Sequence, residues 1–187
     1  MCIPAASWWA SAVVESMLRT RPVQHRRDEA LGCSRGGLTT KIHLVGEGRR
    51  RPLSLLITPG QWGDAPQMIP VLNRIRVPRL GGHPRTRPDH LGGDRAYSSR
   101  RNRRYLRRGQ IKHTIAEPKN QQANRRRRGS RGGRPTGFDR HRYARRNEVE
   151  RTFLALKGFR AVATRYEKRA YVFHGTVTLA AFRLRLR

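Results

Sequence analysis

Two apolar segments rich in leucine and β-branched residues, 38–45 and 52–58, are separated by only six polar or glycine residues. The first alternates apolar and polar side chains, which is the pattern of a strand with one buried face. Because the connection is too short for a crossover helix, the two segments are expected to pair as an antiparallel hairpin. Pro59 and Gly60 end the second strand.

The rest of the chain alternates strand and helix patterns. In chain order we expect strand 10–18, helix 64–75, strand 89–94, helix 99–109, strand 111–116, helix 139–157 and an amphipathic segment 170–186 that packs back on the sheet. This alternation predicts one α/β domain with a hairpin near its start. A length of 187 residues suits a single domain.

The chain carries 42 basic and 12 acidic residues, a net charge of +30. Such an excess needs a polyanion to neutralise it, so nucleic acid is the expected partner. Most of the basic residues are Arg, which suits phosphate recognition but also follows from a GC-rich genome. No basic amphipathic helix favours a membrane, and no small-molecule substrate is indicated. Cys2 and Cys33 lack zinc spacing and are expected to be free thiols in a reducing cytoplasm.

The segment 119–137 is rich in arginine and glycine and has no acidic residue. It cannot bury a core, and we expect a flexible, disordered basic insertion. Its central run consists of Arg125, Arg126, Arg127 and Arg128, which are candidate DNA contacts.

Carboxylates are so few that each position carries information. Glu15 lies within the first predicted strand, Asp94 directly follows a weak strand, and Glu150 lies in the middle of a helix. Asp64 and Asp139, in contrast, occupy positions where a side chain caps a helix.

On the predicted helix 139–157, Tyr143, Arg146, Glu150 and Lys157 fall within about 60° of one another, at about 100° per residue. An apolar stripe lies beside them. The helix would therefore pack on a core and present a hydroxyl, a carboxylate and two cations at the border of a cleft. An equally simple interpretation is a surface helix with an ion pair between Arg146 and Glu150.

The spacing Tyr143-x2-Arg146-x3-Glu150-x6-Lys157 resembles the tyrosine-arginine-glutamate-lysine signature of DDE transposases from bacterial insertion sequences. Further blocks of this sequence are similar to family segments in the same order: residues 35–44, 58–64, 93–99, 126–135 and 146–157. The resemblance runs from about Val13 to the C-terminus.

This resemblance implies an RNase H-like fold, a mixed sheet flanked by helices, with three acids that bind two Mg²⁺ ions, for which Mn²⁺ may substitute. By similarity the acids are Glu15, Asp94 and Glu150, because phosphodiester chemistry with two metal ions needs hard oxygen ligands. The implied activity is cleavage and strand transfer at element ends. The implied partners are terminal inverted repeats and target DNA, a second copy of the chain, and the nucleoid as the place of action.

Within the signature, Arg146 and Lys157 would neutralise phosphates, and Tyr143 would donate to phosphate or stack on a base. Lys41 and His43 are expected to lie at a sheet edge or to face DNA, with Lys41 as a DNA contact and no catalytic role for His43.

Three departures from the family pattern predict weak or absent cutting. Glu15 stands where an Asp is expected, which displaces its oxygens by about 1 Å. The strand before Asp94 contains Gly92 and Gly93, which weakens positioning. The family's N-terminal helical segment is not found before the first acid, so we expect a shortened copy, with residues 1–10 an unstructured remnant and 11–187 the catalytic domain.

Two other functions fit parts of the sequence. A basic nucleic-acid-binding protein without catalysis would explain the charge and the segment 119–137, but it does not need the ordered blocks around Asp94 and Glu150. A nuclease of the same fold that cuts without joining would have the same residues.

Overall fold

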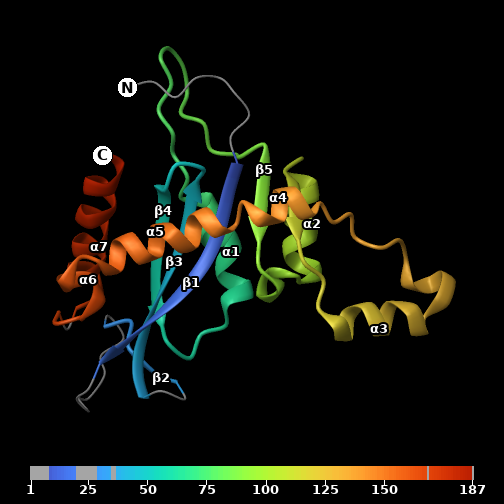
Figure 1. Ribbon diagram of the computed structural model, residues 1–187, viewed down its shortest axis with the longest axis horizontal. Helices are drawn as coiled ribbons and strands as arrows, with labels where there is room; N and C mark the ends of the chain where they lie inside the picture. The colour runs from blue at the N-terminus through green and yellow to red at the C-terminus, as the bar shows by residue number, and fades with distance from the viewer. Residues whose placement is uncertain (1–8, 20–28, 35–36, 168, 187) are drawn as a thin grey trace.

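The chain forms a mixed sheet with helices on both faces (Figure 1). The computed structural model describes residues 9–19, 29–34, 37–167 and 169–186, and for 9–19 it describes the backbone and its pairing. The strands in the described part are β1 (Trp9–Arg19), β2 (Gly32–Ser34), β3 (Gly37–Glu47), β4 (Arg51–Pro59), β5 (His90–Gly93) and β6 (Lys112–Ile115).

The predicted hairpin is confirmed as β3 and β4, which pair antiparallel with Leu44 opposite Leu55. Strand β1 pairs antiparallel with the other side of β3, so β3 is an interior strand. The short strand β2 pairs antiparallel with residues 37–39 of β3, on the side of β3 away from β1. The antiparallel half of the sheet is therefore built from the first 59 residues.

The other half of the sheet is parallel. Strand β5 pairs parallel with β1 on one side and with β6 on the other. The long connection from β4 to β5 contains helix α1 (Asp64–Asn73), and the connection from β5 to β6 contains α2 (Arg100–Arg108). Parallel neighbours need such crossovers, which explains why strands and helices alternate here.

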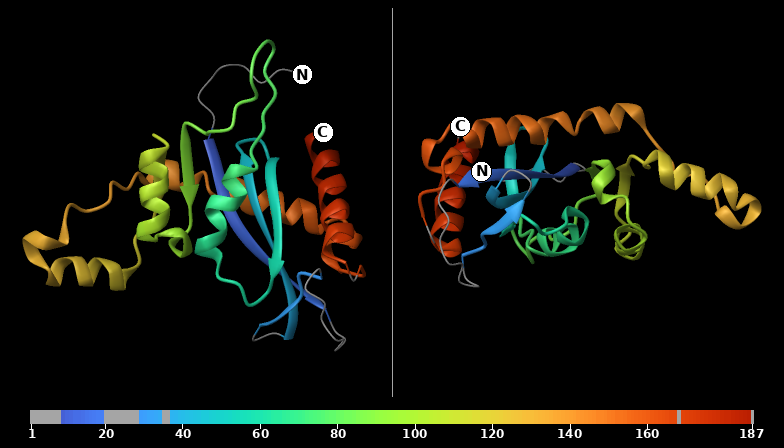
Figure 2. Two further views of the ribbon diagram at one scale, coloured as in Figure 1. Left: turned by 180° about the vertical axis from the view of Figure 1, so that it is seen from behind. Right: turned by 90° about the horizontal axis from the view of Figure 1, so that it is seen from below.

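The remaining helices follow β6. They are α3 (Lys119–Arg127), α4 (Arg140–Ala144), α5 (Asn147–Lys157), α6 (Arg160–Ala163) and α7 (Ala170–Arg185), with short 3₁₀ turns η1 (Arg95–Tyr97) and η2 (Gly129–Gly132). Helices α4 and α5 lie on one side of the sheet, and α1 and α2 on the other (Figure 2, right).

Each face of the sheet has its own hydrophobic core. On one face, Met68 and Leu72 of α1 and Leu106 of α2 pack with sheet residues that include Leu91 and Val45. On the other face, Val149, Phe153 and Leu156 of α5 pack with Phe173 and Val177 of α7 against Ile42 and Leu44. Burial on both faces explains why β3 is apolar or buried along most of its length.

The α/β class and the expected positions of the strands are confirmed, and the C-terminal segment packs on the sheet as expected, through α7. Within the described residues, no helix combines the length and the apolar composition that crossing a bilayer requires.

Phe173 and Phe182 on α7 test this second core. Phe173 is fully buried, whereas Phe182 is 59% exposed. We expect Phe173→Ala to lower the free energy of unfolding by about 3–5 kcal/mol, through lost burial and the cavity that remains, and Phe182→Ala by under about 1 kcal/mol. Urea unfolding measures both. Equal losses would show that α7 does not pack in this orientation.

Candidate active site

Asp94 lies directly after β5, the central strand of the parallel half of the sheet. The last residue pair between β1 and β5 joins Ala12 with Gly93, so Asp94 is the first residue beyond it. The carbonyl oxygen of Asp94 accepts a hydrogen bond from the Tyr97 backbone N–H at 3.0 Å, which closes the turn η1. The side chain of Asp94 is half-buried. The carboxylate thus stands at the end of a buried strand, as predicted.

Gly93, directly before Asp94, has a packing role that the sequence did not indicate. Strand β5 is buried at all four positions and paired on both sides. A Cβ atom on Gly93 would lie 3.3 Å from Ile115 Cγ1 and 3.6 Å from Tyr97 Cδ2. Glycine therefore allows β6 and η1 to approach closely. Neighbouring strands, rather than the β-propensity of the residues, hold the backbone that leads to Asp94.

The helix predicted over 139–157 is two helices, α4 and α5, with a turn at 145–146 between them. Asp139 caps α4 as expected, because its Oδ1 accepts a hydrogen bond from the Arg142 backbone N–H at 3.0 Å. The stretch contains neither proline nor glycine, so the pattern alone gave no sign of the break. The single helical face predicted for the four signature residues is therefore wrong.

These residues nevertheless form a continuous path of contacts. The Tyr143 hydroxyl on α4 donates to Asp94 Oδ1 across a long 3.4 Å. The Arg146 guanidinium lies 5.4 Å from the centre of the Tyr143 ring, a cation–π contact. Arg146 Nη1 also pairs with Glu150 Oε1 at 2.7 Å. The path links Asp94 and Glu150, which are distant in the sequence, through Tyr143 and Arg146.

Tyr143 is held so that it can act as a hydrogen-bond donor. Partial burial raises the pKa of its phenol; the Asp94 charge raises it further, and the Arg146 charge opposes the rise. The hydroxyl therefore keeps its proton at neutral pH. Its ring packs against Phe138, with centroids 5.0 Å apart. An aromatic contact on one side and a cation on the other fix the ring beside Asp94.

Glu15 is placed through its backbone alone. It lies in β1 opposite Ile42 of β3, and its side chain is outside the described part of the structure. Among the described side chains there is no group of three or more His, Cys, Asp or Glu residues that could hold a metal ion. The described part therefore supplies two of the three expected acids, Asp94 and Glu150.

The expectation that Lys41 and His43 lie at a sheet edge is wrong, because β3 is paired on both sides. His43 is buried, and its Nε2 lies 2.7 Å from Thr58 Oγ1. Lys41 Nζ donates to the Trp62 carbonyl and pairs with Asp64 Oδ1, both at 2.8 Å. Asp64 is therefore the first residue of α1 and an ion-pair partner, not the expected cap.

The basic segment 119–137 also differs from the loop that we expected. Residues Lys119–Arg127 form α3, and Gly129–Gly132 form a 3₁₀ turn. The first nine residues contain Ala, Gln, Lys and Arg, which are good helix formers, and the glycines begin only at Gly129. The average composition of residues 119–137 does not distinguish the helix-forming first half from the glycine-rich second half.

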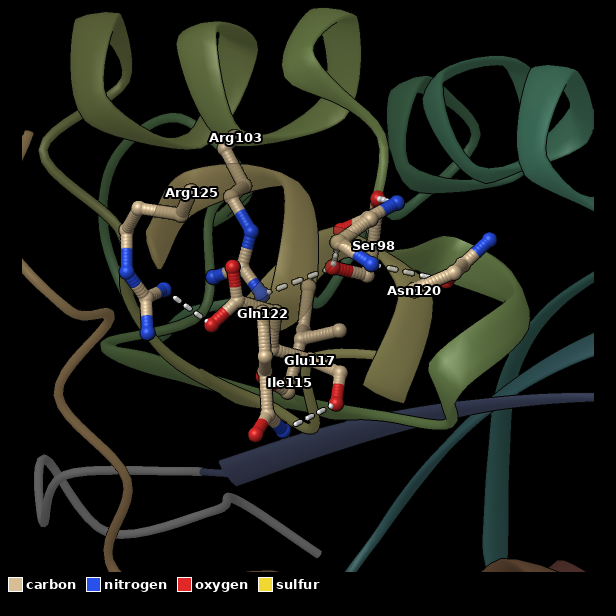
Figure 3. Close-up of polar contacts among 8 residues, drawn as sticks. Ser98, Arg103, Ile115, Glu117, Asn120, Gln122 and Arg125 are labelled. Atoms are coloured by element: carbon tan, nitrogen blue, oxygen red, sulfur yellow. Dashed lines mark hydrogen bonds and ion pairs between the residues drawn. The ribbon is translucent and has the colours of Figure 1, made fainter. Parts of the chain in front are cut away.

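Polar contacts attach α3 to the rest of the domain (Figure 3). Arg125 pairs with Glu117. Gln121 Nε2 donates to the Ser98 carbonyl at 2.7 Å, and the Ser98 hydroxyl donates to Gln121 Oε1 at 2.9 Å. Arg103 Nη2 donates to both Ser98 Oγ and the carbonyl of Ile115. These partners could not be predicted from the sequence, since single polar residues in a basic stretch form no pattern.

Arg125 thus differs from its three neighbours. Its side chain is 17% exposed, whereas Arg126, Arg127 and Arg128 are exposed at the end of α3. Lys157 is exposed at the end of α5. Exposed cations at these two places can meet a polyanion, whereas Arg125 already neutralises Glu117.

Comparison with known proteins identifies the family of this chain. Residues 18–183 match the family described as transposase DDE domain, a stretch that contains Asp94 and Glu150 and begins after Glu15. A protein named as the transposase for insertion sequence element IS402 of Burkholderia cepacia is 34% identical over 137 residues, 73% of this chain and 57% of that protein. One named as the transposase for element IS6501 of Brucella ovis is 31% identical over 150 residues, 80% of this chain and 100% of that protein. The chain thus spans little more than half the length of the IS402 relative.

The burial of His43 predicts a pH effect on stability. Burial lowers the pKa of His43 from 6.5 to about 4; Lys41 lowers it further and Asp64 opposes the shift. The unfolded chain takes up the proton first as the pH falls below about 6.5, so stability is lost between about pH 6.5 and 4. In His43→Gln we expect the loss between about pH 7 and 5 to be smaller by about 2 kcal/mol. Urea unfolding at both pH values measures this, and an unchanged loss would show that His43 titrates normally.

Proposed function

The chain belongs to the DDE transposases of insertion sequences, and we propose on that basis that it cleaves and rejoins DNA strands at the ends of such an element with divalent metal ions. The path of contacts from Asp94 through Tyr143 and Arg146 to Glu150 carries this proposal. It keeps two carboxylates from distant segments beside an aromatic hydroxyl and a cation, which is a set of groups suited to phosphodiester chemistry.

We infer that the fold is RNase H-like. Strands β4, β3 and β1 run antiparallel in this spatial order, and the parallel strands β5 and β6 follow on the other side of β1. Helices cover both faces, and the two described acids lie at a strand end and on a later helix. This order, these directions and these positions support the inference.

The environment of Asp94 fits a metal ligand. In a chain with 42 basic residues, no cationic side chain of the described part lies within ion-pair distance of Asp94, and its hydrogen-bond partner there is the distant Tyr143 hydroxyl. Its oxygens are therefore available, and carboxylate oxygens are the ligands that Mg²⁺ prefers. Asp94, Glu150 and Glu15 would hold two Mg²⁺ ions, which when bound stabilise the attacking and leaving oxygens of the reaction.

Glu15 is proposed as the third acid from its backbone position. Ala12 pairs with Gly93, so residues 13–15 continue β1 beside Asp94. Directly opposite residues of an antiparallel pair share a face of the sheet, and Ile42, opposite Glu15, packs with Val149 and Phe153 of α5. Position 15 therefore belongs to the face that carries α5.

The cationic and aromatic residues of the signature would bind the DNA strand. Arg146 pairs with Glu150 through Nη1, and the remaining N–H groups of its guanidinium could donate to a phosphate oxygen. Tyr143 can donate its proton to phosphate or stack on a base, and Lys157 can neutralise a phosphate farther along. Lys41 is not among the proposed DNA contacts, because it forms an ion pair with Asp64.

We propose terminal inverted repeats and target DNA as partners, with the nucleoid as the place of action. The exposed arginines of α3, Arg126 to Arg128, would extend the contact along the duplex. Joining two element ends in one reaction calls for two copies of the chain, so a homodimer is proposed on DNA.

A basic nucleic-acid-binding protein without catalysis is the second candidate. The net charge of +30 and the exposed arginines of α3 favour it, because phosphate contacts alone give strong binding without sequence preference. The two proposals differ in what the carboxylates do: a binder would gain affinity if Asp94 or Glu150 were neutralised, and would not need metal.

Cleavage of a duplex that carries the terminal inverted repeats tests the proposal. With Mg²⁺ present, Asp94→Asn and Glu150→Gln should each reduce cleavage by about 100-fold or more, since even outer-shell groups of metal sites are worth 10–100-fold. Glu148→Gln, on the same helix two residues away, is the matched control and should stay near the parent. Cleavage that is unaffected by Asp94→Asn, or independent of metal, would contradict the proposed catalysis, and nucleic-acid binding without catalysis would remain as the function.

The length of residue 15 gives a separate test. A glutamate side chain is one methylene longer than that of aspartate, which would displace the carboxylate oxygens at position 15 by about 1 Å, and octahedral Mg²⁺ tolerates little error. We expect Glu15→Asp to increase cleavage and to increase the rise in melting temperature that Mg²⁺ produces without DNA. Glu15→Gln should abolish that rise. If all three forms respond equally to Mg²⁺, position 15 is not a ligand.

A further inference from the structure

A second basic site lies away from the carboxylates. A cleft of about 850 Å³ opens between α2, the start of β6 and the segment 132–137. The charged residues that line it are Arg103 and Arg107 of α2, Lys112 of β6 and Arg134 on the facing segment. No carboxylate is among its described lining residues, so four cations from three segments face one hollow.

The two histidines of the cleft do not add to this charge at neutral pH. Burial, with the nearby Arg142 charge, lowers the pKa of His90 to about 4. Burial likewise lowers the pKa of His113, against the hydrogen bond to the Ile111 carbonyl. The electrostatic field of the cleft therefore comes from arginine and lysine, which stay charged at every physiological pH.

The wall formed by 132–137 is held in place by glycine packing. A Cβ atom on Gly132 would lie 2.1 Å from the Arg125 carbonyl oxygen, so only glycine fits against α3 here. Gly133 has a φ of 75°, a conformation that glycine adopts without strain. Since Arg125 is itself paired with Glu117, the wall that carries Arg134 is attached to the body of the domain through α3.

The cleft lies at the opposite end of β5 from Asp94. His90 begins the strand and lines the cleft, and Asp94 follows the last residue. Four residues of strand span about 13 Å, which is about four nucleotide steps of a DNA strand. The length of β5 between Asp94 and the cleft is therefore within the span of a short DNA segment.

We propose that this cleft binds the sugar-phosphate backbone of DNA as a second contact outside the cutting site. The inference rests on DNA as the partner in the proposed function, but not on catalysis. Spaced cations without carboxylates match a chain of phosphates better than a single small anion, which needs converging donors rather than four cations spread around a large hollow.

The salt dependence of DNA binding, measured without divalent metal, tests the proposal. The cleft variant carries Arg107→Gln, Lys112→Gln and Arg134→Gln. Arg103 is kept because it bonds to Ser98 and Ile115. The matched control carries Arg100→Gln, Arg104→Gln and Arg108→Gln, three exposed arginines of the same helix that do not line the cleft.

For a duplex of arbitrary sequence, we expect the slope of log K against log salt to fall by about 2.7 in the cleft variant, and for a single strand by about 2.1. The control should change far less. The form of DNA that shows the larger loss of affinity identifies the strand type in the cleft. Equal changes in the two variants would mean diffuse surface charge, and no change in the cleft variant with either DNA would also overturn the proposal.

The single substitution Lys112→Gln separates a loss of DNA binding from a loss of folding, because Lys112 is exposed at the start of β6 and its replacement should not destabilise the protein. It should lower the duplex slope by about 0.9 with an unchanged melting temperature. If the expected slope change is seen but the protein does not cleave DNA, the proposed catalysis is wrong and the cleft proposal stands. If the protein cleaves DNA but Lys112→Gln leaves the slope unchanged, the cleft proposal is wrong and the proposed catalysis stands.

Discussion

Carboxylates in this chain are few, and the surplus of positive charge determines how they are used. Asp64 pairs with Lys41, Glu117 with Arg125, and other acids pair with nearby arginines in the same way. These pairs tie together segments that would otherwise repel one another, such as α1 to β3 and the basic helix α3 to the residues after β6. Asp94 differs, because no cation of the described part pairs with it. At the end of β5, and without a cation of the described part paired with it, Asp94 is well placed to take an external positive charge.

The sequence predicted those elements whose signal is local. The hairpin of β3 and β4 follows from two apolar runs and a short turn, and α2 lies within the predicted range 99–109, with Ser99 as its cap and Gly109 at its end. The position of Asp94 directly after β5 was also predicted, although the strand is poor in β-formers. The assignment of Asp94 and Glu150 to one site came from the family signature, and their roles in metal binding and catalysis stay predictions.

The features that the sequence did not predict depend on contacts between distant segments. The break between α4 and α5 has no glycine or proline to mark it. The burial of His43 depends on β4 and β1 pairing on either side of β3, and the pattern of one strand contains no information about its neighbours. Gly93 was expected to weaken the strand before Asp94. Instead it allows the close approach of Ile115, a residue of another strand that the local pattern does not reveal. Propensity describes a residue alone, and tertiary packing overrode it at each of these places.

The short helix α4 connects the two proposed DNA contacts. Two consecutive residues on it reach opposite ends of β5: Arg142 Nη1 lies 3.1 Å from His90 Nδ1 in the wall of the cleft, and Tyr143 donates to Asp94. Because His90 is neutral, its Nδ1 can accept from the guanidinium while Nε2–H donates to Thr114 Oγ1 at 3.0 Å. A helix continuous with α5 would have a fixed orientation set by the second core. The turn at 145–146 lets α4 follow β5 instead, so the break that disrupts the predicted helical face is what allows one five-residue helix to contact both ends of the strand.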